Sequence, residues 1–404
     1  MIFMTSLMNP ALASNILFII SFMTVQPTRK LVASCEQTDK DPLWVYMDVP
    51  DLGPRHNWTT FEICQIKVAY FYGVVIASPP AGILSEWLGP KNTICFPLLF
   101  AGIINVLSPH GAKWGWGVPF ACRFIVGLSS GTVYPALQCF VGKWAPPNER
   151  GKFLNAFMGD AIGTAVVWVM IQYTAPLFGW HWTFYILSIL IGIHCTAFWF
   201  LTSNEPEDHR YITVEEIEYI RSWKVSIDKE DKEFPPFKDI VTSSECWAAT
   251  ILQFGSLWGV NLQLLLVPIF INQFMGIMAH DSVLIAILPH ITRFCSGIFF
   301  GNLSDFIRTR EMGSNTLMSK ILVVFSHIIP TMILMSLGSV KCNTVASILL
   351  LIFSNVFTAA SVGTNLRAPT DLSPNFAGII YLWFGSAEIQ PWNTKEGRRQ
   401  IPRW

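Results

Sequence analysis

The chain alternates between long apolar runs and shorter polar segments, and this alternation predicts its architecture. A helix needs roughly 20 mostly apolar residues to cross the hydrocarbon core of a bilayer, and about ten runs predict such spans. The predicted spans are residues 1–23, 63–84, 95–107, 115–141, 154–173, 182–201, 247–269, 282–300, 321–337 and 345–362. The pattern therefore predicts an all-α polytopic membrane protein.

The composition supports this class and excludes others. Hydrophobic residues make up 52% of the 404-residue chain and charged residues only 13%, a balance too apolar for a soluble globule of this length. The formal net charge is zero and the charges lie mostly between the apolar runs, so we expect a lipid bilayer and no nucleic acid as partner. The nine cysteines have no CxxC spacing and predict neither a metal site nor a cofactor. We find no motif that predicts an enzyme.

A charged segment divides the chain. Residues 1–202 and 246–404 contain the apolar runs, whereas residues 203–245 are rich in charge. We expect two helical bundles joined by a cytosolic linker. Within the linker, residues 214–223 have helical periodicity and acidic residues near their start, which predicts a short surface helix.

The segment around the first span gives mixed signals for orientation. Asn57 begins the N-glycosylation sequon Asn-Trp-Thr, which is modified only on the outer or luminal side. Arg29 and Lys30 argue mildly for the opposite orientation under the positive-inside rule. Residues 1–23 lack the basic leader and the cleavage site of a signal peptide, so we interpret them as the first span.

The fourth predicted span contains a full charge. Arg123 lies about eight residues inside it, roughly 12 Å deep at 1.5 Å per residue. A charge at that depth costs on the order of 3 kcal/mol even on permissive insertion scales. Gly127, Gly131 and Pro135 follow at regular spacing, as expected for close helix packing around a polar path.

Two glycine-containing loops repeat one pattern of acidic and basic residues. The first, after the second span, has Gly82, Glu86, Gly89 and Lys91, and the second, after the eighth span, has Gly301, Asp305 and Arg308. An acid and a base around a glycine turn can bridge neighbouring helix ends, and so hold one conformation and release it in another. The recurrence predicts two related halves.

The stretch from residue 115 to residue 153 carries a family resemblance. Its run GLxxGxxYPAxxxxxxKWAPPxERxK resembles the SLC17 family of anion transporters within the major facilitator superfamily. That family includes sodium/phosphate cotransporters, sialin and the vesicular glutamate transporters. The loop with Glu86 is similar to the superfamily's loop between helices two and three.

The resemblance implies a fold and a function. The fold would be two six-helix bundles, and the function secondary active transport of a small anion, either inorganic phosphate or an organic anion. Transport would proceed by alternating access coupled to sodium or protons, in the plasma membrane or an intracellular vesicle membrane.

The resemblance and the residues together give candidate site residues. Arg123 matches a family position implicated in holding the substrate anion, although it could instead pair with a fixed acid for packing. Lys67 matches the place of a histidine in the vesicular glutamate transporters, and could add to an anion site or snorkel to the interface. Asp160 could be the coupling acid for a proton or a sodium ion, or neutralise a basic neighbour. His290 and Arg293 lie in the eighth span, where such residues more often bond to neighbouring helices.

The sequence also departs from the family pattern. Ala13 and Ser256 stand where an arginine is expected, and Ser130 stands where a glutamate used in proton coupling is common. The two serines weaken an assignment as a proton-coupled glutamate or sialate transporter. The apolar pattern of the last two helices is lost after residue 381, so we expect ten spans of twelve and poor transport by this chain. A non-transporting, degenerate paralogue is therefore the alternative function.

Overall fold

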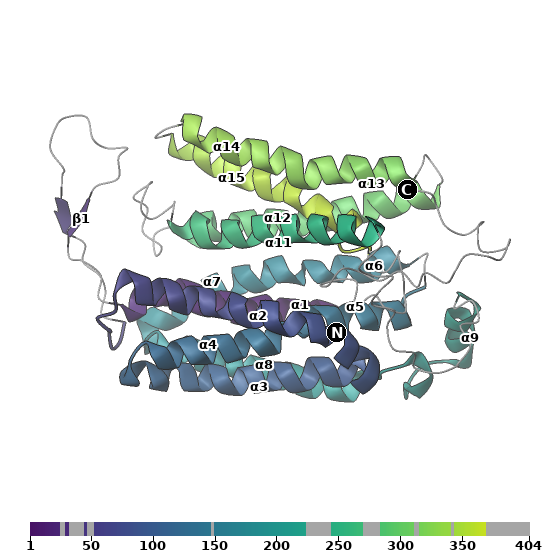
Figure 1. Cartoon of the computed structure of the whole chain (residues 1–404), viewed down its shortest axis with the longest axis horizontal. Coiled ribbons are helices and arrows are strands. Elements are labelled where there is room, and N and C mark those ends of the chain that lie inside the picture. The colour runs from purple at the N-terminus through teal and green to yellow at the C-terminus, as the bar shows by residue number, and fades with distance from the viewer. Residues whose placement is uncertain are drawn as a thin grey trace.

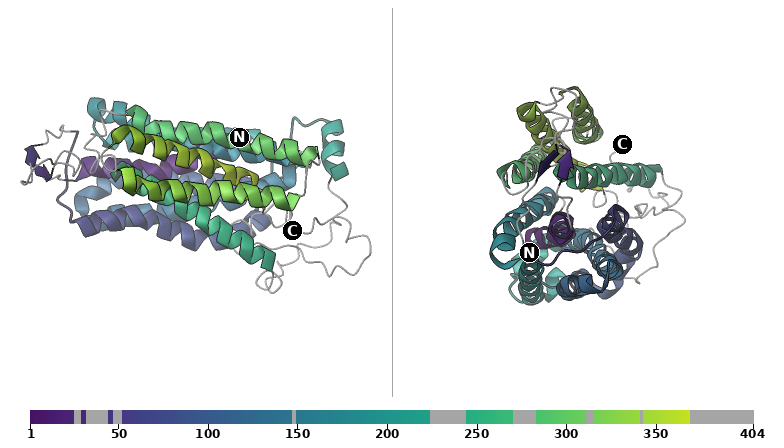
Figure 2. Two further views of the ribbon diagram at one scale, coloured as in Figure 1. Left: turned by 90° about the horizontal axis from the view of Figure 1, so that it is seen from above. Right: turned by 90° about the vertical axis from the view of Figure 1, so that its left-hand side faces the viewer.

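The chain folds into two stacked groups of long helices (Figure 1). The computed structural model describes residues 1–24, 29–31, 44–46, 52–146, 149–223, 244–269, 283–310, 315–340 and 343–368. The first group contains α1 to α8 and the second contains α11 to α15. Viewed along the helices, the two groups form separate clusters (Figure 2).

The first group holds the helices that precede the linker. They are α1 (Ile2–Met23), α2 (Thr60–Leu88), α3 (Pro90–Gly111), α4 (Gly117–Ser130), α5 (Val133–Trp144), α6 (Arg150–Asn155), α7 (Gly159–Phe178) and α8 (His181–Leu201), with the 3₁₀ turns η1 (Ala112–Trp114) and η2 (Ala156–Met158). Between α1 and α2, the strands β1 (Arg29–Leu31) and β2 (Trp44–Tyr46) pair antiparallel, with Lys30 opposite Val45. Helix α2 begins with a capping box, in which Thr59 and Glu62 bond each other's backbone N–H groups.

The second group follows the linker. It contains α11 (Ser244–Ile269), α12 (Val283–Thr309), α13 (Asn315–Val323), the π-helical turn η5 (Val324–Ile328), α14 (Ile329–Val340), α15 (Thr344–Thr358) and the 3₁₀ turn η6 (Ala359–Gly363). Of the linker, the structure describes η3 (Pro206–Asp208) and α9 (Val214–Trp223). Helix α9 confirms the surface helix predicted from the sequence.

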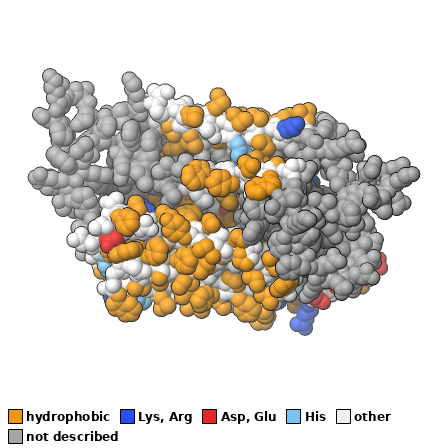
Figure 3. All heavy atoms as spheres, in the orientation of Figure 1, with side chains coloured by type: hydrophobic (Ala, Val, Ile, Leu, Met, Phe, Trp, Pro, Cys, Tyr) orange, Lys and Arg blue, Asp and Glu red, His pale blue; other side chains and the backbone are white. Residues whose placement is uncertain are grey.

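The helices have the length and surface of membrane spans. Among the described residues, eight helical segments are long and apolar enough to cross a membrane. Helices α11 and α12, with 26 and 27 residues, are also long enough. Hydrophobic side chains cover much of the visible flank between the two ends of the molecule (Figure 3), and Phe200 and Met335 are about three-quarters exposed. Such a surface belongs in lipid, which confirms the polytopic membrane class. The lost apolar pattern after residue 381 lies outside the described residues.

The two ends of the molecule differ. The end near β1 and β2, at the left of Figure 1, is called the hairpin end, and the end near α9 is called the linker end. The short loops α3–α4 and α7–α8 at the hairpin end contain Lys113 as their only charged residue. At the linker end, the segment between α5 and α7 contains Glu149, Arg150 and Lys152.

Glycines allow the closest helix contacts of the first group. A Cβ at Gly73 of α2 would meet the backbone of α4, and a Cβ at Gly127 of α4 would meet the Tyr70 carbonyl of α2. Gly163 of α7 lies in the same way against the Leu7 backbone of α1. Small residues at these positions let the backbones approach, as in other membrane helix pairs.

We predict that Gly127→Ala destabilises the fold, because its methyl group would overlap the Tyr70 carbonyl unless α2 and α4 separate. Overpacking of this kind costs about 1–3 kcal/mol. Thermal unfolding of the purified protein should show a lower midpoint for Gly127→Ala than for Gly192→Ala, since a Cβ at Gly192 meets no atom within 4 Å. Equal midpoints for the two variants would contradict the close contact.

Candidate functional site

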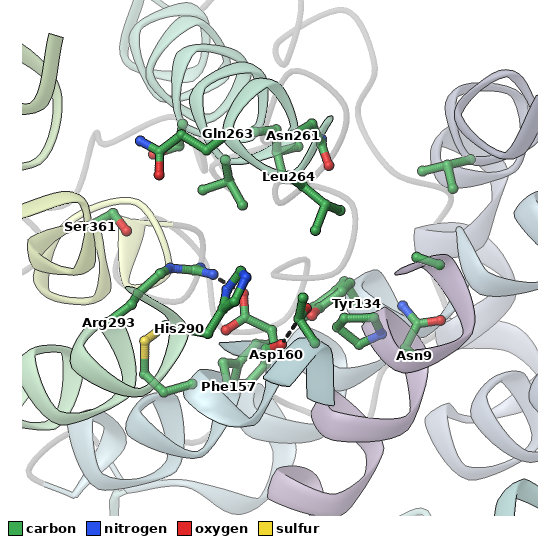
Figure 4. Close-up of a pocket in the computed structure, with 18 of the residues that line it drawn as sticks. Asn9, Tyr134, Phe157, Asp160, Asn261, Gln263, Leu264, His290, Arg293 and Ser361 are labelled. Carbon is green, nitrogen blue, oxygen red and sulfur yellow. Dashed lines mark hydrogen bonds and ion pairs between the residues drawn. The ribbon is translucent and has the colours of Figure 1, made fainter. Parts of the chain in front are cut away.

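A cavity of about 250 Å³ lies between the two groups of helices. Its walls come from α1, α2, α4, α5 and α7 of the first group and from α11, α12 and the α15–η6 segment of the second. Figure 4 shows side chains of both groups facing each other across it. The cavity is therefore the place where the halves share a surface, which is where transporters built from two repeats bind their substrates.

An ion pair crosses this cavity from one group to the other. Arg293 Nη2 of α12 donates a hydrogen bond to Asp160 Oδ2 of α7 at 2.7 Å. The two side chains are only 10% and 19% exposed. His290, one turn before Arg293 on α12, lies beside the pair in the same cavity (Figure 4). The sequence places Asp160 in a different predicted span from His290 and Arg293, and the structure brings the three residues together.

The pair is incompletely satisfied. Asp160 Oδ1 and Arg293 Nε are buried, and neither has a hydrogen-bond partner among the described residues. Buried polar atoms are nearly always bonded, and an exception asks for a reason. The pair therefore makes only one of the two parallel hydrogen bonds that a guanidinium can make to a carboxylate.

The two walls of the cavity differ in chemistry. Among the described residues, the first group supplies every Phe, Tyr and Trp side chain of the cavity, together with one amide, Asn9. These aromatic side chains are Phe18, Tyr70, Phe71, Tyr134, Phe157 and Trp168. The second group supplies five amides, Gln253, Asn261, Gln263, Asn355 and Asn365. One wall can therefore hold an apolar body, and the opposite wall can hydrogen-bond a polar group.

Arg123 lies behind the aromatic wall. Its side chain is buried, and its Nη1 and Nη2 donate to the carbonyls of Leu12 at 2.9 Å and Ala13 at 2.6 Å on α1. The guanidinium also stacks on the ring of Tyr70, 5.0 Å from its centroid. Tyr70 and Ala13 line the cavity, whereas Arg123 does not. Its contact with substrate stays a prediction.

Lys67 lies further from the cavity. It is half-buried on α2, one turn from Tyr70 towards the hairpin end, and it does not line the cavity. Ser130 and Ser256, where the resemblance expects a glutamate and an arginine, both line it. Ser256 accepts a hydrogen bond from Asn365 and is 3.2 Å from His327 Nε2, which belongs to the π-helical turn η5. Its members lie 71 and 109 positions apart in the chain, so no local sequence pattern predicted this network.

The first glycine loop lies at the linker end and binds within its own half. Glu86 Oε2 is 4.0 Å from Lys143 Nζ of α5, and Lys143 is 3.9 Å from Glu205. Asn204 accepts a hydrogen bond from the Lys91 backbone at 3.0 Å. The loop thus connects α2, α3 and α5 to the start of the linker.

Two glycines of this first loop fit its tight geometry. Gly82 is buried inside α2. Gly89 joins α2 to α3 with a φ of +85°, a conformation that favours glycine, and it packs on Asn204.

The second motif is not a loop, because α12 continues through it: Gly301, Asp305 and Arg308 lie in the last turns of this helix (Val283–Thr309). It also lies at the linker end, but it contacts the other half. Asp305 forms an ion pair with Arg367, in the same half, and its carboxylate also lies against Gly151 of α6. Gly301 packs on Asn155, whose Nδ2 donates to Asn302 Oδ1 at 3.0 Å.

Arg308 completes the bonding of this motif within the second half. Its Nη2 donates to Ser319 Oγ at 3.2 Å and to the Gly363 carbonyl at 3.3 Å. In both motifs, therefore, the acid pairs with a base of its own half that lies outside the motif: Lys143 at the end of α5, and Arg367 in the turn after η6.

Asn57 is exposed at the hairpin end, three residues before α2 begins. Its position is compatible with modification, and its glycosylation stays a prediction.

The comparisons with known proteins identify the family. The family description of the Major Facilitator Superfamily matches residues 2–388, so the chain belongs to this superfamily of secondary transporters and is not an enzyme. The fold agrees. The proton:xylose symporter XylE bound to 6-bromo-6-deoxy-D-glucose superimposes with a TM-score of 0.65 at 12% identity, covering 94% of this chain and 82% of that one.

The chain is also distantly similar to members of the SLC17 family. Sodium-dependent phosphate transport protein 1 of Mus musculus is 26% identical over 328 residues, which are 81% of this chain and 70% of that protein. Sialin of Ovis aries is 26% identical over 331 residues, 81% of this chain and 66% of sialin. Vesicular glutamate transporter 2.1 of Danio rerio is 27% identical, and the match spans 56% of its length.

We predict that Arg123→Gln lowers stability, because it removes two charge-assisted bonds to α1, each worth about 1.5–3 kcal/mol. The control is Arg221→Gln, which breaks an exposed pair with Glu207 that should contribute little. Thermal unfolding and anion affinity are measured for both variants. A stable Arg123→Gln protein with weakened anion affinity would instead place Arg123 in the substrate site.

Proposed function

We propose that the chain transports a small anion by alternating access, coupled to sodium or protons. The observation that supports this most is the Asp160–Arg293 pair in the cavity between the halves. A guanidinium is the side-chain group best suited to bind a carboxylate or a phosphate. The carboxylate of Asp160 already binds Arg293 in the way that a substrate anion would. His290 and the amide wall add hydrogen-bonding groups around the same place.

The anion is inorganic phosphate or an organic anion. The names of the relatives include phosphate and glutamate transport, and the aromatic wall favours an organic anion with an apolar body. The two serines at positions 130 and 256 support a glutamate or sialate transporter less well. A non-transporting paralogue is the alternative, and it predicts no saturable uptake.

The coupled ion is a proton or a sodium ion, and Asp160 is its proposed site. As an acid at the contact of α7 and α12, Asp160 would respond to both the anion and the coupled ion. Lys67 would add positive electrostatic potential from behind the aromatic wall. Arg123 would hold α1 in place through its hydrogen bonds to the α1 backbone.

The two glycine motifs are the proposed conformational switches. The halves also touch at the linker end, where Asn155 bonds Asn302. Beside the cavity, Gln138 Nε2 donates to the carbonyl of Leu366, a residue that lines it, at 3.1 Å. Separation of the halves at the linker end would open the cavity there, and Glu86 and Asp305 would release their bases as the helix ends move. We assign the linker end to the cytosol, because its short loops carry more basic residues, in the plasma membrane or a vesicle membrane.

The proposal is tested by uptake into proteoliposomes of labelled inorganic phosphate and labelled benzoate, with sodium and proton gradients imposed separately. The informative variant is the neutral pair Asp160→Asn/Arg293→Gln, because a single change would leave one buried charge stranded at a cost of about 3–5 kcal/mol. We expect the neutral pair to fold and to lose most uptake.

The matched control for that variant is Arg310→Gln, since Arg310 is exposed just past the end of α12. It should keep wild-type uptake. Unchanged uptake by the neutral pair would remove Arg293 from the site, and no uptake of either probe by the wild type would favour the non-transporting alternative.

Orientation has its own test. If the hairpin end is outside or luminal, Asn57 receives a glycan, so glycosidase treatment should increase gel mobility of the wild type and leave Asn57→Gln unaffected. This variant keeps Thr59, which caps α2, so a loss of the glycan is not a loss of fold. A glycosidase-insensitive wild type whose residues near Asn57 react only with a membrane-permeant reagent would contradict the orientation.

A further inference from the structure

We infer that anion binding and proton binding are coupled at one pair of residues. An anion that binds Arg293 displaces the carboxylate of Asp160 from the guanidinium, and the displaced Asp160 takes up one proton. This inference rests on the proposed anion transport and specifies its coupling. It makes the coupled ion a proton, and it fixes the stoichiometry at one proton for each anion bound, so that a monoanion loads the site without a change in net charge.

The geometry of the pair allows this exchange. Asp160 is held by one hydrogen bond, from Arg293 Nη2 to Oδ2, while Oδ1 and Arg293 Nε are buried without partners among the described residues. An arriving carboxylate or phosphate can accept two parallel bonds from the guanidinium, where Asp160 accepts one. The better geometry favours the ligand, and no described donor other than Arg293 holds the Asp160 carboxylate in place.

Charge balance requires a compensating ion. At rest the site contains one guanidinium and one carboxylate, and its net charge is zero. Addition of a monoanion alone would leave two negative charges near one positive charge inside the membrane, which is strongly unfavourable. With a proton on Asp160, the loaded site again contains one cation and one anion, and no atom or charge is unaccounted for.

The neighbours of Asp160 leave few other acceptors for this proton. Of the elements packed on α7, α12 contributes Arg293 and His290, and α1 contributes no ionisable side chain. His194 of α8 is engaged with Thr5 Oγ1 at 3.0 Å. Tyr134 of α5 lines the cavity as a neutral phenol. His290 is thus the competing proton acceptor, and the experiment must separate it from Asp160.

A sodium ion fits this place less well than a proton. Hard cations take several oxygen ligands, whereas the side chains that α12 presents to Asp160 are a guanidinium and an imidazole. A proton needs no such shell.

The exchange also links loading to movement. Asp160 belongs to the first half and Arg293 to the second, so the pair ties α7 to α12. When the anion binds the guanidinium, the direct hydrogen bond between Asp160 and Arg293 is replaced by contacts through the anion. The protonated Asp160 then no longer holds α12. Loading by anion or proton alone would leave an unpaired charge, so movement of the half-loaded protein is disfavoured.

The test measures proton uptake on anion binding by the purified full chain in nanodiscs. Benzoate is titrated calorimetrically at several pH values and in two buffers with different ionisation enthalpies, because benzoate itself stays ionised throughout. We expect close to one proton taken up per benzoate, and about a tenfold tighter apparent Kd for each unit that pH falls in the working range. Phosphate is the second probe, corrected for its own titration.

Three variants assign the proton. Asp160→Asn should bind benzoate with an affinity that no longer depends on pH and that at pH 7.5 exceeds the wild type's, because the competing carboxylate is gone. His290→Gln should keep the wild-type slope. Glu215→Gln is the matched control, since Glu215 is exposed on α9 and does not line the cavity, and it should also keep the slope.

The outcomes separate the inference from the proposed function. Saturable benzoate or phosphate binding to the wild type without proton uptake, or with an equivalent sodium requirement, would overturn the inference and leave anion transport standing. A slope lost in His290→Gln and kept in Asp160→Asn would also overturn it. No saturable binding of either probe would overturn both. The number of protons that the wild type takes up per benzoate tests the inference even if Asp160→Asn fails to fold.

Discussion

A guanidinium inside a membrane must be compensated by a partner, and the two buried arginines of the cavity region find partners of different kinds. Arg123 donates to two backbone carbonyls of α1, within one half of the molecule. Arg293 bonds a carboxylate of the other half. Backbone carbonyls cannot be neutralised or exchanged, so Arg123 is suited to holding a wall in place. A carboxylate can be protonated and displaced, so Arg293 is suited to a step that changes during transport.

The rest of the fold positions this exchangeable pair. Glycines bring α2 against α4 and α1 against α7, which fixes the wall that carries Asp160. At the linker end, the motif with Asp305 contacts α6, whereas the loop with Glu86 binds only its own half and the linker. The two motifs have similar sequences but different tasks in this conformation. The contacts between the halves therefore lie at the centre and at the linker end.

Sequence reasoning predicted the elements of the fold better than the partners within it. The apolar runs gave the spans, and helical periodicity gave α9, because both signals are local. The acids of the two glycine motifs were found, but their bases lie elsewhere in the chain, Lys143 on α5 and Arg367 in the turn after η6. Asp160 and Arg293 are 133 positions apart, and only the rotation and tilt of α7 and α12 decide that they meet. Arg123 bonds backbone carbonyls, and a pattern of side chains in the sequence does not predict backbone partners.

The central claim is that the substrate anion binds Arg293 in the cavity between the halves. A structure of the full chain with 4-iodobenzoate tests it most directly, because the iodine marks the ligand without ambiguity. The account predicts the carboxylate on Arg293, the ring against Tyr70 and the aromatic wall, and Asp160 moved out of hydrogen-bond distance from Arg293. A ligand bound at Arg123 or outside the cavity, with the Asp160–Arg293 bond intact, would contradict it.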